Sequence, residues 1–65
     1  MKIYIVQVIS NFNPLAIKIS QEGFKTFEDA RDWCRNKPGI KEELQDGWGF
    51  IAEDYEYWIH DILVR

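Results

Sequence analysis

Apolar residues recur in a strand-like pattern over the first ten residues of the chain. Most of them are β-branched, a residue type that favours strands. Successive side chains of a strand point to opposite faces, which places Tyr4, Val6 and Val8 on one face and Ile3, Ile5 and Ile9 on the other. Because both faces are apolar, we predict a central strand over residues 2–10 with a packed layer on each side.

A second alternating segment follows over residues 15–20. Leu15, Ile17 and Ile19 recur at every second position, and we expect them to face inward. Residues 11–14 read Asn-Phe-Asn-Pro, which is turn chemistry, since Asn tolerates unusual backbone angles and Pro cannot donate to a strand ladder. The two segments are therefore predicted to form a β-hairpin.

The pattern changes to helical spacing after residue 25. Thr26 is a good N-cap, because its hydroxyl can accept a hydrogen bond from a free backbone N–H of the first turn. The predicted buried stripe of this helix consists of Phe27, Ala30, Trp33 and Cys34. Residues 38–39, Pro-Gly, are expected to end the helix.

The last third of the chain is rich in aromatic and β-branched residues, a composition typical of strands. We predict a hairpin that turns near Glu53 and Asp54, with a final strand from residue 55 to about residue 64. Residues 48–52 are either the first strand of this hairpin or irregular. Residues 40–46 are either one or two helical turns or a loop.

The predicted fold is a single α+β domain over residues 1–65. An antiparallel sheet of three to four strands carries one helix packed on one face, in the order ββαββ or ββαβ. One helix covers only one face of the first strand, although both are apolar. The uncovered face must be met by the aromatic C-terminal segment or by a second copy of the chain.

Small domains of this kind need additional stabilising features. A single core in a chain of 65 residues gives about 3–5 kcal/mol of net stability. Cys34 is the only cysteine, which excludes an internal disulfide, and His60 is the only histidine, which leaves no His/Cys cluster for a metal. We expect no metal and no cofactor, and aromatic packing and oligomerisation remain as the stabilising features.

The apolar start of the chain is too short to span a bilayer and is interrupted by Gln7. We therefore expect no membrane association. One free cysteine without a secretion signal favours the reducing cytoplasm.

Cys34 and His60 are the candidate catalytic side chains. Cys34 lies on the apolar stripe, where a packed thiol behaves as a small inert hydrophobe. His60 and Asp61 are neighbours, so in a strand they point to opposite faces and cannot pair. A catalytic His60 would need a partner elsewhere, such as Glu53 or Asp54. We expect the protein not to be an enzyme.

Charge is unevenly distributed along the chain, whose net charge is −3. Residues 1–41 carry seven Lys or Arg and four acids, whereas residues 42–64 carry seven acids and no Lys or Arg. Exposed Tyr and Trp are frequent binding anchors, and spaced carboxylates complement a basic protein surface. The predicted partner-binding residues are Glu53, Asp54, Tyr55, Glu56, Trp58 and Asp61.

A simpler alternative is that the aromatic residues of this third form the core and the acids keep the fold soluble. Direct nucleic-acid binding is disfavoured, because the aromatic residues lie among acids rather than among Lys and Arg.

Residues 23–30, Gly-Phe-Lys-Thr-Phe-Glu-Asp-Ala, enter a helix after a predicted hairpin, and a Tyr- and Trp-rich terminal strand follows. This layout resembles that of small acidic proteins of phages and mobile elements, among them anti-CRISPR proteins that inhibit host defence. The resemblance is one of size, acidity and element order, and no functional residue is carried across. It implies action by binding, in some cases by blocking a nucleic-acid channel with negative charge.

The sequence thus predicts a small acidic protein-binding module that presents an acidic-aromatic surface to a basic partner. In a narrower form, it is a phage-type inhibitor of a host-defence nucleoprotein. The alternative is a homodimeric structural module in which the uncovered sheet face or an edge strand pairs with a second copy.

Overall fold

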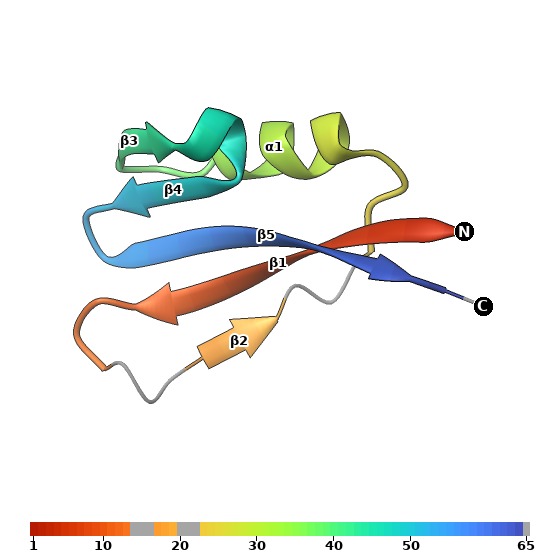
Figure 1. Cartoon of the computed structure of the whole chain (residues 1–65). Helices are drawn as coiled ribbons and strands as arrows, with labels where there is room; N and C mark the ends of the chain where they lie inside the picture. The colour runs from red at the N-terminus through yellow and green to blue at the C-terminus, as the bar shows by residue number, and fades with distance from the viewer. Residues whose placement is uncertain (14–16, 20–22, 65) are drawn as a thin grey trace.

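The computed structural model describes residues 1–13, 17–19 and 23–64 (Figure 1). Its elements follow in the order β1 (Lys2–Ser10), β2 (Ile17–Ile19), α1 (Phe27–Arg35), β3 (Ile40–Leu44), a short 3₁₀ turn η1 (Gln45–Gly47), β4 (Gly49–Ala52) and β5 (Tyr55–Leu63). The strands form one antiparallel sheet in the order β2-β1-β5-β4-β3, with α1 against one face. The predicted α+β class and the single helix are confirmed.

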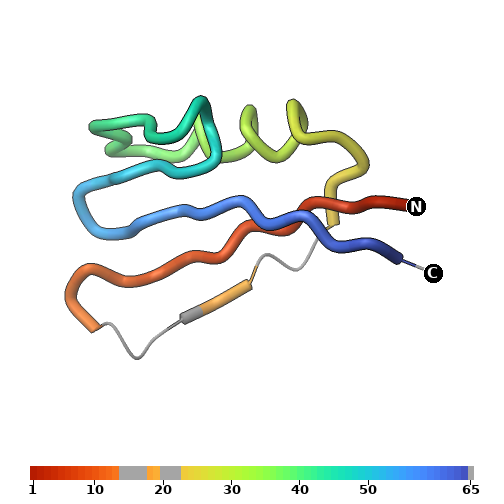
Figure 2. Tube along the Cα trace, in the orientation of Figure 1, coloured from red at the N-terminus to blue at the C-terminus, as the bar shows by residue number. Residues whose placement is uncertain are grey.

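The sheet is built around the pairing of β1 with β5. The two strands are in register along their whole length, from Lys2 opposite Leu63 to Ser10 opposite Tyr55. This pairing brings both ends of the described chain together, and the amino group of Met1 donates to the carbonyl of Val64 at 3.1 Å (Figure 2). As predicted, β1 is an interior strand, with β2 on its other side.

The sheet has five strands rather than the predicted three to four, because residues 40–44 form β3 and are neither helical nor a loop. Charged residues of low strand propensity made this segment ambiguous. As an edge strand, β3 pairs only with β4, which leaves its charged side chains in solvent. The chain then turns through η1, where Gly47 has φ 97°, and enters β4, so residues 49–52 are a strand.

The hairpin of β1 and β2 is also confirmed, with Val8 opposite Lys18. Within the loop, Ser10 Oγ accepts from the backbone N–H groups of Phe12 and Asn13. The inward orientation predicted for Ile19 is wrong, because 59% of this residue is exposed on an edge strand. The predicted inward position of Leu15 lies outside the described residues.

The helix forms where the sequence predicts it. Thr26 is the N-cap, and its Oγ1 accepts from the backbone N–H of Asp29 at 3.1 Å. Of the predicted stripe, Ala30 and Cys34 are fully buried, and Phe27 and Trp33 are half-buried against the core. The buried hydrophobic residues of the described chain are Val6, Ala30, Cys34, Phe50, Ala52, Tyr57 and Ile59.

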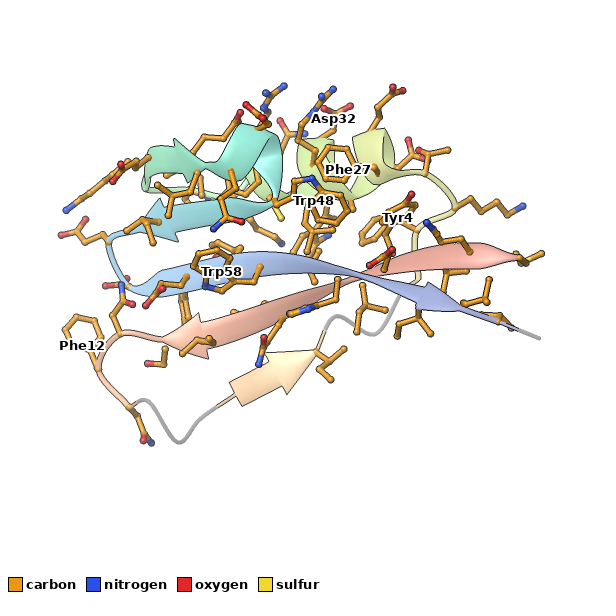
Figure 3. All side chains as sticks on the ribbon, viewed as in Figure 1. Tyr4, Phe12, Phe27, Asp32, Trp48 and Trp58 are labelled. Carbon is orange, nitrogen blue, oxygen red and sulfur yellow. The ribbon has the colours of Figure 1, made fainter. Side chains whose placement is uncertain are left out.

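Aromatic rings close the space between α1 and the sheet. Figure 3 shows Tyr4, Phe27 and Trp48 gathered there, and the ring centroids of Phe27 and Trp48 are 4.4 Å apart. Trp33 continues the layer, with its ring centroid 6.2 Å from that of Tyr57. We refer to this side of the sheet as the covered face.

The opposite side, which we call the open face, has no helix over it among the described residues. On this face Trp58 of β5 lies between Gln7 of β1 and Gly49 of β4, each directly opposite it in the neighbouring strand. The indole of Trp58 lies over Gly49, since a Cβ built on Gly49 would fall 2.5 Å from Cζ3 of the ring. The aromatic C-terminal segment was one of the two predicted covers for this face. Of its aromatic residues, Trp58 alone lies there.

We predict that Gly49→Ala destabilises the fold by about 1–3 kcal/mol, because the added methyl group would overlap the Trp58 ring. The measurement is chemical denaturation of the variant and of a Trp58→Leu background. In that background the same substitution should be nearly neutral, because the ring is gone. An equal loss of stability in both backgrounds would show that the ring does not explain the need for glycine.

Candidate functional site

The six residues predicted to bind a partner fall in three places. Glu53 and Asp54 form the β4–β5 turn, and Tyr55 follows on the covered face beside Tyr57. Glu56 and Trp58 alternate with these and lie on the open face. Asp61 lies far along β5, opposite Tyr4. The structure therefore brings together Glu53, Asp54 and Tyr55 and separates the other three.

The separated residues have partners within the chain. Asp61 forms an ion pair with Lys2, with Oδ2 and Nζ 3.4 Å apart and both side chains half exposed. The Nε1–H of Trp58 donates to Glu56 Oε1 at 3.3 Å. Neither pair combines with the β4–β5 turn into a single acidic-aromatic surface.

The backbone of the β4–β5 turn is held from two neighbouring loops. The Nδ2 group of Asn11 donates to the carbonyls of Ala52 at 3.1 Å and Glu53 at 3.2 Å, and the backbone N–H of Asn11 donates to the carbonyl of Asp54 at 2.9 Å. On the other side, the N–H of Glu53 donates to the carbonyl of Gly39 at 3.2 Å. Three loops meet at this end of the sheet (Figure 1).

Sequence reasoning identified the acids of this turn but not the residues that hold it. The sequence pattern indicates Asn11 only as a turn former and Gly39 only as a helix stop. Gly39 has φ 77°, a left-handed conformation that favours glycine, and this backbone geometry places its carbonyl beside the turn. No local signal in the sequence marks either contact, because both join segments far apart in the chain.

The carboxylates of the turn are available to a partner. Glu53 and Asp54 are both exposed, and in the described part of the chain neither takes part in an ion pair. Glu43, by contrast, accepts from Nε and Nη2 of the Arg35 guanidinium, at 2.8 and 3.0 Å, and this hydrogen bonding lowers the pKa of the Glu43 carboxyl. The negative charge of the C-terminal third is therefore partly neutralised at β3 and β5, and it is free at the turn.

A pocket of about 260 Å³ lies beside the two acids. Its lining consists of Pro38, Gly39, Ala52, Glu53, Asp54, Tyr55 and Tyr57. Tyr55 and Tyr57 also line a second hollow of about 350 Å³, which reaches Trp33 and the cations Lys18 and Lys37. The ammonium group of Lys37 lies 3.9 Å from the centroid of the Trp33 ring. The covered face thus ends in an aromatic groove with acids at one side and lysines at the other.

The aromatic residues of the last third differ in their burial. Phe50 and Tyr57 are buried and Trp48 packs against the core, whereas Tyr55 is 44% exposed. Burial raises the pKa of the Tyr57 hydroxyl, with smaller contributions from Tyr55, Cys34 and Asp54. Only Tyr55 therefore combines ring exposure with a position beside the free acids.

Comparison with protein-family models, with curated proteins and with solved structures found no match. Among the described residues, no helix has the length and apolar character needed to cross a membrane. Within the same residues, no group of three or more His, Cys, Asp or Glu side chains is placed to hold a metal ion.

The two side chains considered for catalysis lie apart from the acidic turn. His60 is on the open face, with Nε2 2.9 Å from Gln7 Oε1, and Asp61 is on the opposite face. Cys34 is fully buried in α1. Burial raises the pKa of its thiol to about 12, and the nearby charge of Lys37 only partly offsets this effect.

We predict that Cys34 reacts slowly with a thiol reagent in the native protein, since the thiolate is the reactive form and the thiol is both buried and protonated at neutral pH. The rate at which Cys34 reacts should rise at least a hundredfold in denaturant. The measurement uses a thiol reagent that releases a chromophore, whose absorbance is followed over time. Rapid stoichiometric labelling of the folded protein would contradict this and identify Cys34 as an accessible nucleophile.

Proposed function

We propose that the chain is a protein-binding module that presents the β4–β5 turn to a basic surface of another protein. The proposal rests on one observation: the backbone of this turn is held by hydrogen bonds, while its two carboxylates are exposed. Asn11 and Gly39 fix the main chain of the turn, while the carboxylates of Glu53 and Asp54 stay exposed and make no ion pair among the described residues.

A turn held in this way loses little conformational freedom when it binds. Ordering a flexible loop opposes association, and a loop that is already ordered avoids most of that loss. Its charges also keep a fixed arrangement before encounter, which favours rapid association with a surface of opposite sign.

The adjacent pocket indicates which side chain the partner would insert. Pro38, Ala52 and the two tyrosine rings offer apolar surface to a methylene stem, and the acids at the rim accept from a cationic head group. An exposed tyrosine face also attracts a cation. Arginine suits this combination better than lysine, because its planar guanidinium can bond two carboxylate oxygens at once.

In its narrower form, the proposal is that the basic partner is a host-defence nucleoprotein and that the acidic turn takes the place of a phosphate group. Binding rather than catalysis fits a chain whose thiol is buried and whose histidine has no acidic partner among the described residues. We place this activity in the cytoplasm, where an unpaired cysteine is stable.

The test uses Nα-acetyl-argininamide as the probe, titrated into the ¹⁵N-labelled protein at low salt. We expect chemical-shift changes at Gly39, Ala52 and Tyr55, and much smaller changes with the uncharged citrulline analogue. The double variant Glu53→Lys/Asp54→Lys should bind about tenfold more weakly, since two exposed charge contacts of up to about 1 kcal/mol each are lost.

The matched control is Glu28→Lys/Asp32→Lys, which makes the same change in net charge at two exposed positions on α1. This variant should keep the affinity of the parent within a factor of about two. Glu56 is left unchanged, because it lies on the open face and bonds to Trp58. Equal weakening in both double variants, or equal shifts with the citrulline analogue, would show that the turn has no specific role.

A further inference from the structure

The open face of the sheet carries a broad apolar surface. Its apolar residues come from every strand and are Ile3, Ile5, Ile9, Ile19, Leu44, Ile51, Trp58 and Ile62. Ile62 is 41% exposed, and Ile19 is more exposed still. Large contiguous apolar patches are rare on monomeric proteins and mark interaction sites.

Two polar contacts lie within this face. The Nε2 atom of His60 is 2.9 Å from Oε1 of Gln7, and the indole N–H of Trp58 donates to Glu56. These two contacts lower the penalty of removing water from the centre of the face, where unpartnered polar atoms would otherwise be buried. The face also carries two acids. Glu42 in β3 and Glu56 in β5 both lie opposite Ile51 of β4, one on each side of it.

The size of the face reaches the lower limit of what a specific interface needs. The five strands contain 30 residues. With about 3.3 Å along a strand and about 4.8 Å between strands for each residue, they cover roughly 480 Å² in projection. Two such faces packed together would bury roughly 1,000 Å², which is the lower limit for a stable protein–protein interface.

The accessible surface of the chain is slightly larger than that of a typical folded monomer of its mass. The accessible surface is 4745 Å², whereas a folded monomer of 7.8 kDa typically exposes about 4,400 Å². The buried core contains only seven residues in the described chain, all between α1 and the sheet. A domain this small gains stability from oligomerisation when it has no disulfide or metal.

We propose that the open face is covered by the open face of a second copy of the chain. The two sheets pack face to face about a two-fold axis, about 10 Å apart, with one helix layer on each outer side. Because the same isoleucine surface meets itself, apolar side chains of one copy pack against apolar side chains of the other. The acidic turn lies at the end of the sheet, so this inference does not depend on the function proposed for it.

The test is sedimentation of the whole chain from 1 to 500 µM. We expect a species of twice the 7.8 kDa chain mass at the upper concentrations. Ile5→Asp, near the centre of the face, should weaken dimerisation at least a hundredfold, because it places a charge between two apolar layers. Ile62→Asp should weaken it at least tenfold.

The matched control is Leu63→Asp. Leu63 is next to Ile62 in β5, is 71% exposed, and points to the opposite side of the sheet, so this change should leave the dimer intact. If Ile5→Asp does not fold, as judged by circular dichroism, the comparison of Ile62→Asp with Leu63→Asp decides. A monomeric parent at 500 µM would overturn the proposal. A dimer that persists in Ile62→Asp would also overturn it and indicate pairing through the edge strands β2 or β3.

Discussion

A helix of nine residues has to cover a sheet of five strands, and it can cover only one face. The pairing of β1 with β5 along their whole length fixes which side chains receive that cover, since alternation sends Val6, Tyr57 and Ile59 toward α1 and Ile5 and Trp58 away from it. The core, the groove and the exposed apolar surface all follow from this division. A shift of one residue in the register of β1 would exchange the two faces.

The two surfaces that result differ in chemistry. Where the helix ends, the end of the sheet carries a firmly held acidic turn, an exposed tyrosine and a small pocket, which together suit a cationic side chain. The open face carries isoleucines around two internal polar contacts, which suits a contact with a second copy. In such a dimer both turns stay outside the interface, so one assembly would present two acidic sites. Linked sites of this kind raise the apparent affinity for a partner with two basic patches.

Local patterns in the sequence predicted much of the fold. The central position of β1, the first hairpin, the Thr26 cap and the apolar stripe of α1 depend on residues close together in the chain, and the structure confirms them. β3 could not be predicted, because charged residues with weak strand preference become a strand only by pairing with β4. The predicted site grouped Tyr55 with Glu56 and Trp58, although strand alternation separates them, and the role of Asn11 depends on a contact across more than forty residues.

The central claim is that both faces of the sheet are buried, one by α1 and the other by a second copy. The most direct measurement is the exposure of isoleucine δ1 methyl groups to a soluble paramagnetic reagent, recorded by NMR at low and high protein concentration. Ile59, which is 5% exposed beneath α1, is the internal reference. The account predicts that the relaxation rate that the reagent causes at the Ile5 and Ile62 methyl groups falls toward that of Ile59 as the protein concentration rises. The rate at the methyl groups of Leu63, on the other side of the sheet, should not change. Methyl groups of Ile5 and Ile62 that remain equally accessible at all concentrations would contradict it.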